Sequence, residues 1–309
     1  MSKIVLIDWG IISHTAIYSR QSAIIRKNEA EEKGIDTTNC FIMPSSTYIA
    51  LTMLFGALKK IGLNKCDIVI IACDGRGNWR KDFSKDYKGD REKKKEATGI
   101  DFKAEYQKMN ELLENLEIST PFHIIKLPTI EADDIMAVAS KNFKEYEKIL
   151  VSYDKDLLQL LVYDNVKIFS NHPTLKNYPY KILHSNREKE KQKAYGLLNK
   201  KIYKEESDNL KSENITESED ENRELIVNLL DLPDFIVKPI EKELKIAVNS
   251  YKEFDIDYLW YPKLIKRYHE SFSKTNVITY EKCLNRIKKK ENKRRRINNE
   301  SKSSKRKSG

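Results

Sequence analysis

Residues 67–74 read DIVIIACD, an unbroken apolar run, rich in β-branched side chains, that ends in a carboxylate. A strand that is apolar on both faces fits the interior of a parallel sheet, where helices cover both sides. Short runs of this kind alternate with helical patterns through the first 170 residues: strands are expected at 4–8, 67–74, 122–127, 148–152 and 166–169, and helices at 45–61, 101–116, 132–143 and 157–161. This alternation predicts an α/β fold with a parallel sheet flanked by helices.

The composition changes near residue 170, where apolar residues thin out and charged helical patterns take over. We therefore expect a core domain at 1–170, which includes a long loop at 75–100, and a helical C-terminal region at 171–275. Helical patterns in the second region lie at 187–204, 221–230, 233–251 and 257–272, and the polar stretch SENITESED at 212–220 is expected to be a linker.

The positive charge is concentrated in a basic tail at 276–309. The chain has a net charge of +10, and residues 282–309 alone hold 13 Lys or Arg against two Glu, or +11, so the rest sums to 10 − 11 = −1. A stretch this charged buries too little apolar surface to fold by itself, and its natural partner is a polyanion. A solubilising end of low complexity accounts for the same charge.

Two broad classes of protein are not supported. No apolar run approaches the roughly 20 residues needed to cross a bilayer, so we expect a cytoplasmic protein, in the host cytoplasm if a phage encodes it, with no membrane contact. The four cysteines and five histidines show no metal-ligand spacing, so no zinc site is expected.

Acidic residues follow the predicted strands, at the point where each strand ends: Asp8, Asp74, Glu131, Asp133, Asp134, Asp154 and Asp156. The carboxyl ends of parallel strands share one edge of a sheet, which is where α/β folds build their sites. Helix capping accounts for any one of these acids, but it leaves the extra carboxylates of EADD (131–134) and DKD (154–156) unexplained.

Carboxylates gathered at one edge repel each other, and a bound cation relieves that repulsion. Oxygen ligands without an organised His or Cys favour Mg²⁺ or Mn²⁺. Two such ions can activate a water and stabilise the leaving oxygen of a phosphodiester. The pattern therefore predicts a metal-dependent nuclease.

The loop after Asp74 supports this prediction. Residues 75–95, GRGNWRKDFSKDYKGDREKKK, mix three aromatic residues with nine Lys or Arg. Aromatic rings that stack on bases and cations that pair with phosphates are typical of nucleic-acid-binding surfaces. A solvated, charged helix explains the lysines but not the aromatic residues.

Together these features resemble the 5′ nuclease superfamily of flap endonucleases and 5′→3′ exonucleases, which has a PIN-like fold. Within it, the chain most resembles the ribonuclease H of T-even phages. The likeness covers most of residues 4–169 and returns at 215–251. WRKDFSKDYKGDR (79–91) is similar to the helical arch motif, EADDIMA (131–137) to the central acidic motif, and SYDKDLLQL (152–160) to the next one.

The resemblance implies a role for each matched residue. Asp8, Asp74, Glu131, Asp133 and Asp154 would surround a first, catalytic metal ion, with Asp156 nearer a second and Asp134 a less certain member. Lys88 resembles the catalytic lysine that contacts the scissile phosphate. Arg80 and Arg91 resemble phosphate clamps.

The chain departs from the family pattern after residue 200. A Gly-Asp-x-x-Asp-Asn element is replaced by Lys204, Glu205, Glu206, Ser207, Asp208 and Asn209. Glu205 and Asp208 are therefore only candidates for a second, weaker metal site. The helix-turn-helix module that normally follows is truncated or absent, which implies a reduced helical C-terminal region and weaker duplex binding.

The implied function is Mg²⁺-dependent 5′→3′ exonuclease or flap endonuclease activity, with removal of RNA primers in phage-type DNA replication. The implied partners are 5′-flap or 5′-end DNA and RNA:DNA hybrid, together with a single-strand-binding protein or sliding clamp. Two alternatives remain: a catalytically impaired, nucleic-acid-binding replication accessory protein with the same fold, and a PIN-like ribonuclease, which would lack the arch motif.

Overall fold

The structure is a computed structural model of the 309-residue chain, and it describes residues 1–33, 44–64, 66–84, 87–88, 95–170, 181–184 and 225–250. Within these ranges no helix is both long enough and apolar enough to cross a membrane. The helical patterns predicted at 187–204 and 257–272, the linker at 212–220 and the tail at 276–309 lie outside the described residues.

The centre of the protein is a six-stranded sheet with the order β3-β2-β1-β4-β5-β6. Its strands are β1 (Lys3–Asp8), β2 (Ile68–Cys73), β3 (His123–Lys126), β4 (Glu147–Val151), β5 (Val166–Ser170) and β6 (Lys181–His184). All neighbouring pairs are parallel except β5 and β6. The predicted parallel sheet is thus confirmed, and the antiparallel edge strand β6 is an addition that the composition after residue 170 did not predict.

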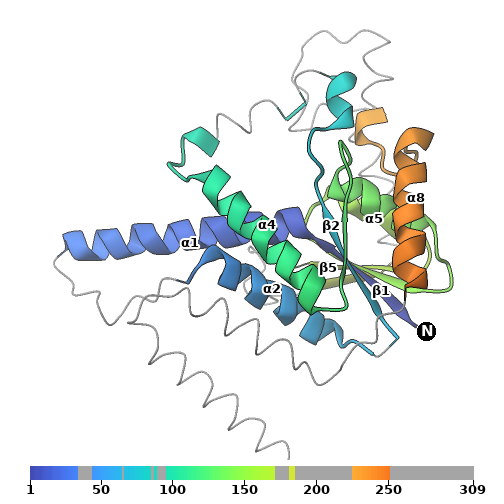
Figure 1. Ribbon diagram of the computed structural model, residues 1–309, viewed down its shortest axis with the longest axis horizontal. Helices are drawn as coiled ribbons and strands as arrows, with labels where there is room; N and C mark the ends of the chain where they lie inside the picture. Colours follow the sequence, from blue (N-terminus) through green and yellow to red (C-terminus); the bar gives the residue numbers. More distant parts are fainter. Residues whose placement is uncertain are drawn as a thin grey trace, which may run out of the picture.

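Helices cover both faces of the sheet (Figure 1). One face carries α1 (Trp9–Glu32), α2 (Ser46–Ile61) and α4 (Phe102–Ser119), and the other carries α5 (Ala132–Lys141) and α8 (Asp234–Asn249). Two 3-10 helices complete the described elements: η1 (Trp79–Asp82) follows β2, and η2 (Asp156–Val162) follows β4. The PIN-like layered fold is therefore present.

The alternation of side chains along β1 shows why the sheet needs both layers. Val5 and Ile7 pack into the core under α1, α2 and α4, whereas Ile4 and Leu6 pack into the core under α5 and α8. All four side chains are fully buried. A strand that is apolar on both faces is stable only where both faces are covered.

Local signals set the bounds of the predicted helices. Ser45 caps α2 by accepting a hydrogen bond from the Tyr48 amide at 3.2 Å, and Gly62 ends it in the left-handed region at φ +71°. Asp101 caps α4 in the same way through the Ala104 amide, at 3.0 Å. These are the side chains that helix ends favour, and the prediction of both helices is confirmed.

Two elements differ from the prediction. No helix was expected between β1 and residue 45, yet α1 runs for 24 residues from Trp9. Residues 157–161 were expected to form an α-helix, and they lie in the 3-10 helix η2. Only the first turns of α1, as far as Ile17, contribute buried side chains, and the remainder projects beyond the sheet (Figure 1).

Candidate active site

The carboxyl ends of the central strands place four acids at one edge of the sheet. Asp8 ends β1, Asp74 directly follows β2, and Asp154 follows β4. Asp133 lies in the first turn of α5, which enters after β3. Because β1 lies between β2 and β4, the acids at positions 8, 74 and 154 lie at the ends of adjacent strands; the sequence predicted a shared edge but not this strand order.

Asp8 is the most firmly held of these acids. One carboxylate oxygen accepts a hydrogen bond from the Ile11 amide at 3.1 Å, which caps α1, and the other accepts one from the Ser152 hydroxyl at 2.9 Å. The Ser152 oxygen in turn accepts a hydrogen bond from the Asp154 amide at 3.1 Å. The ends of β1 and β4 are therefore fastened together through the site.

The electrostatics of the edge show that these acids act on each other. Burial raises the pKa of Asp8 to about 7, its two hydrogen bonds oppose the rise, and the neighbouring charges of Asp74 and Asp154 add to it. Burial also raises the pKa of Asp133 well above its ordinary value, and Asp154 and Asp8 raise it further. Closely spaced carboxylates with raised pKa values favour a bound cation or proton.

Gly10 lies beside the carboxylates of Asp8 and Asp74. A Cβ atom placed on Gly10 would lie 3.3 Å from one Asp8 oxygen and 3.5 Å from one Asp74 oxygen. The space between these carboxylates is therefore bordered by a residue without a side chain.

Asp74 and Asp154 also shape the backbone around them. Asp74 accepts a hydrogen bond from the Ala132 amide at 2.9 Å, which joins the end of β2 to the start of α5. Asp154 accepts one from the Asp156 amide at 2.9 Å, which organises the start of η2. In the described part of the chain, no three His, Cys, Asp or Glu side chains stand in the arrangement of a complete metal-binding group.

Glu131 differs from the other acids because cations neutralise it. Its carboxylate accepts hydrogen bonds from Arg80 at 2.7 Å and from the Tyr87 hydroxyl at 3.1 Å, and it forms an ion pair with Lys88. Burial acts to raise the pKa of Glu131, but Lys88 and Arg80 outweigh it and lower the pKa below its usual value.

Lys88 is, with Arg80, one of two described arch cations that pair with Glu131. Its backbone is in the left-handed region at φ 59°, which residues other than glycine seldom adopt. Its ammonium group lies 5.0 Å from the centre of the Tyr87 ring. This half-buried conformation directs the ammonium toward Glu131.

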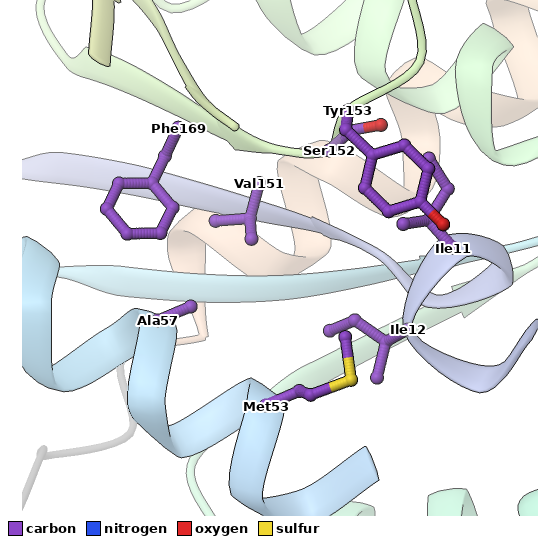
Figure 2. Close-up of a pocket in the computed structure, with 8 residues that line it drawn as sticks. All are labelled: Ile11, Ile12, Met53, Ala57, Val151, Ser152, Tyr153 and Phe169. Atoms are coloured by element: carbon purple, nitrogen blue, oxygen red, sulfur yellow. The ribbon is translucent and has the colours of Figure 1, made fainter. Parts of the chain in front are cut away.

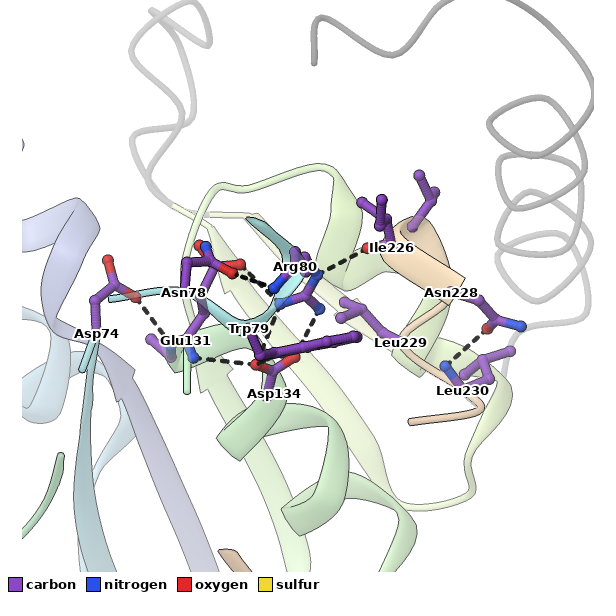
Figure 3. Close-up of polar contacts among 12 residues, drawn as sticks. Asp74, Asn78, Trp79, Arg80, Glu131, Asp134, Ile226, Asn228, Leu229 and Leu230 are labelled. Atoms are coloured by element: carbon purple, nitrogen blue, oxygen red, sulfur yellow. Dashed lines mark hydrogen bonds and ion pairs between the residues drawn. The ribbon is translucent and has the colours of Figure 1, made fainter. Parts of the chain in front are cut away.

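Arg80 does not occupy the position expected of a phosphate clamp. It is only 2% exposed, and its guanidinium pairs with Glu131 and Asp134 (Figure 3). The resemblance implied that this side chain is a phosphate clamp, and the structure instead places it inside the protein, paired with carboxylates. The physical reason is that two carboxylates and a backbone carbonyl enclose the side chain.

Asp134 is likewise corrected as a metal ligand. It is fully buried and accepts hydrogen bonds from Arg80 at 2.6 Å, from the Trp79 indole at 3.0 Å and from the Glu131 amide at 3.0 Å. These contacts fasten the base of the arch to the first turn of α5 (Figure 3). With its oxygens so occupied, Asp134 has a structural role.

Three of the predicted site residues, Arg91, Glu205 and Asp208, lie outside the described residues. Sequence reasoning also missed two residues that shape the site, Gly10 and Ser152. It expected Tyr87, as an aromatic residue of the loop, to stack on bases, but Tyr87 is buried and its hydroxyl donates to Glu131. Gly10 and Ser152 each lie two residues from a predicted acid. Proximity to the acidic motifs was the available signal.

Figure 2 shows a small apolar hollow, which adjoins the acidic edge through Ser152, the donor to Asp8. Ile12, Met53, Val151 and Phe169 line it, and Ser152 and Tyr153 lie at its border with the acids. The Tyr153 hydroxyl hydrogen-bonds to Thr15 at 2.7 Å. The hollow thus borders the carboxylates and does not contain them.

Two relatives match part of the chain. Ribonuclease H of Enterobacteria phage T4 is 34% identical over 116 residues, which are 36% of this chain and 37% of that protein. The 5′–3′ exonuclease of Mycoplasmopsis pulmonis is 31% identical over 118 residues, 38% of this chain and 36% of that protein. The chain therefore matches little more than a third of the length of either relative.

Two solved structures align with 87% of this chain and 98% of their own. They are a T5 protein co-crystallised with metal ions, at 15% identity, and T5 5′-exonuclease with divalent zinc ions bound, at 18% identity, each with a TM-score of 0.38. A TM-score of this size does not by itself establish a common fold, so the family assignment rests on sequence.

That assignment comes from the match of residues 3–195 to the family described as 5′–3′ exonuclease, N-terminal resolvase-like domain. The matched region is more than half of the 309 residues and contains every strand of the sheet and the acids at its edge. The chain therefore belongs to this 5′–3′ exonuclease family, within the 5′ nuclease superfamily.

Proposed function

We propose that the protein is a divalent-metal-dependent 5′ nuclease that hydrolyses phosphodiester bonds at 5′ ends or flaps. The observation that carries the proposal is the gathering of Asp8, Asp74, Asp133 and Asp154 at the edge of the sheet, where burial and mutual repulsion raise the pKa of Asp8 and Asp133. Holding like charges this close destabilises the folded protein. A bound cation would relieve the repulsion, which explains why the carboxylates are placed together.

The donor chemistry fits Mg²⁺ or Mn²⁺. Asp8, Asp74, Asp133 and Asp154 offer only carboxylate oxygens, the ligands that these hard cations prefer. When bound, divalent cations would supply an activated water and charge neutralisation at the leaving oxygen. A second, weaker ion would be held on the side of Asp156, with Glu205 and Asp208 as further candidates.

The other residues of the site would bind and orient the substrate. Lys88 would contact the scissile phosphate from its place beside Glu131, and Glu131 would be a further carboxylate of the first metal site. Arg91 would contact a neighbouring phosphate. Ser152 keeps Asp8 oriented toward the site through its hydrogen bond.

The substrate class is proposed from the family. A 5′–3′ exonuclease family acts on nucleic acid ends, and the similar proteins of phage T4 and Mycoplasmopsis pulmonis are named ribonuclease H and 5′–3′ exonuclease. We therefore propose 5′-end or 5′-flap DNA and RNA:DNA hybrid as substrates, and removal of RNA primers as the role.

A binding-only accessory protein is the second candidate, because Glu131 is already paired with Arg80, Tyr87 and Lys88. Digestion of a 5′-labelled DNA flap and a 5′-labelled RNA:DNA hybrid, with Mg²⁺ and with a chelator, separates the two. The nuclease proposal predicts Mg²⁺-dependent cleavage by the wild type and its loss in Asp154→Ala. Binding without cleavage of either substrate would support the accessory protein.

A further inference from the structure

All three guanidinium nitrogens of Arg80 donate hydrogen bonds inside the protein. Its Nε donates to the carbonyl oxygen of Ile226 at 2.8 Å, Nη1 donates to Glu131 at 2.7 Å, and Nη2 donates to Asp134 at 2.6 Å. Its central carbon lies 4.5 Å from the centre of the Trp79 ring. One side chain therefore joins the base of the arch, the start of α5 and a segment 146 residues away.

The segment that Arg80 reaches, residues 225–230, has a second buried attachment. Gln159, on η2, donates to the Val227 carbonyl at 3.2 Å and accepts from the Leu229 amide at 3.2 Å. Of these two side chains, only Arg80 also contacts an acid of the candidate site, Glu131. Gln159 is thus a matched control for the attachment alone.

The contacts continue from Arg80 to the proposed catalytic lysine. Glu131 receives Arg80 on one carboxylate oxygen and pairs with Lys88 through the other. The position of the Glu131 carboxylate therefore depends on Arg80, and the position of the Lys88 ammonium depends on Glu131. Arg80 suits this role because its planar fork makes several directed hydrogen bonds at once, which a lysine does not.

We infer that Arg80 is a positioning residue, which couples segment 225–230 to Glu131 and through it to Lys88, rather than a group that contacts the substrate. The inference rests on the proposed function for its effect on catalysis. The coupling itself is a property of the fold that is measurable without turnover.

Arg80→Lys keeps the positive charge and loses the fork, and Gln159→Leu removes only the second attachment. For a positioning residue, Arg80→Lys lowers kcat by about 10- to 100-fold with little change in KM, and the salt dependence of substrate binding keeps its slope. Gln159→Leu loosens the segment and leaves kcat near the wild-type value.

Two kinetic outcomes overturn the inference. A raised KM with a salt slope reduced by about one unit in Arg80→Lys identifies a phosphate contact. An equal fall of kcat in Arg80→Lys and Gln159→Leu, at an equal loss of Tm, identifies a general structural role.

Hydrogen exchange of the wild type tests the coupling even if Arg80→Lys does not fold or the protein does not cleave nucleic acid. The amides of Leu230, which is hydrogen-bonded within the segment, and of Ser84 should open together, with one dependence on denaturant, because Arg80 links their segments. Independent opening overturns the coupling. If the two amides open together but the protein does not cleave nucleic acid, the proposed function is refuted and the coupling through Arg80 stands.

Discussion

The carboxylate of Asp8 accepts a hydrogen bond from the hydroxyl of Ser152 at 2.9 Å, across 144 residues of sequence. This contact joins the ends of β1 and β4 at the edge where the acids gather. The serine oxygen also accepts the Asp154 amide at 3.1 Å, so one buried hydroxyl orients two of the proposed metal ligands.

Replacing this hydroxyl should weaken both stability and cation binding. Ser152→Ala removes one of the two hydrogen bonds of the Asp8 carboxylate and the side-chain acceptor of the Asp154 amide, which costs about 1–3 kcal/mol of unfolding free energy. Loss of the hydrogen bond also raises the Asp8 pKa further, so more Mg²⁺ is required for half-maximal binding. Chemical denaturation and Mg²⁺ titration measure the two effects. Ser250→Ala, which removes an exposed hydroxyl, is the control, and equal behaviour of the two variants would contradict the assignment.

The raised pKa of Asp8 predicts a pH dependence that cations remove. Because the pKa rises from 3.8 to about 7 on folding, the folded protein holds a proton that the unfolded chain has released. The resulting stabilisation is complete below the lower value and is lost as the pH rises through about 7. In the presence of a chelator, the Tm of Asp8→Asn minus the Tm of the wild type should therefore increase as the pH rises from 3.8 to about 7. Mg²⁺ should make this increase smaller. Parallel Tm curves would show that Asp8 is not perturbed.

Asp133→Asn should separate stability from activity. The substitution keeps the shape of the side chain and removes a half-buried charge that Asp154 and Asp8 repel. Without cations the variant should be more stable by about 1 kcal/mol, the scale of one pKa unit, while Mg²⁺-dependent cleavage is lost. Glu114→Gln, on the exposed side of α4, should change neither quantity. A destabilised, active Asp133→Asn protein would contradict the proposed ligand role.

Gly10→Ala tests how much room the carboxylates need. The new methyl group would lie 3.3 Å from an Asp8 oxygen, which must shift by a few tenths of an ångström, and 3.5 Å from an Asp74 oxygen, which is ordinary contact. We expect a weaker affinity for Mg²⁺ at a nearly unchanged Tm, because alanine favours a helix over glycine by roughly 1 kcal/mol. Gly56→Ala on α2, where a methyl group meets nothing within 4 Å, is the matched control. An Mg²⁺ affinity equal to that of the control would show that the space beside Gly10 is not used.

The sheet could be predicted from the sequence because its strands are buried on both faces. An apolar run such as 67–74 has few alternatives once helical patterns flank it. The pattern of apolar residues did not predict α1, because apolar residues form a buried side of this helix only as far as Ile17. Beyond that point no apolar stripe marks the helix, so periodicity gave no signal there.

The positions of the acids could be predicted as well, but the state of each acid could not. Asp8 and Glu131 look alike in sequence, since each follows a predicted strand. Burial acts to raise the pKa of both acids. It prevails at Asp8, where neighbouring carboxylates add to it, whereas Lys88 and Arg80 outweigh it at Glu131. That difference depends on contacts between distant segments, which a single sequence does not specify.

The central claim, that these carboxylates share divalent cations, is tested most directly by calorimetric titration of the wild type and Asp8→Asn with Mg²⁺ near pH 7, in buffers of different ionisation enthalpy. The account predicts saturable binding by the wild type with release of protons, because Asp8 is partly protonated at that pH. In Asp8→Asn the binding should weaken and the proton release should disappear. Absence of saturable binding by the wild type, or identical titrations of the two proteins, would contradict the account.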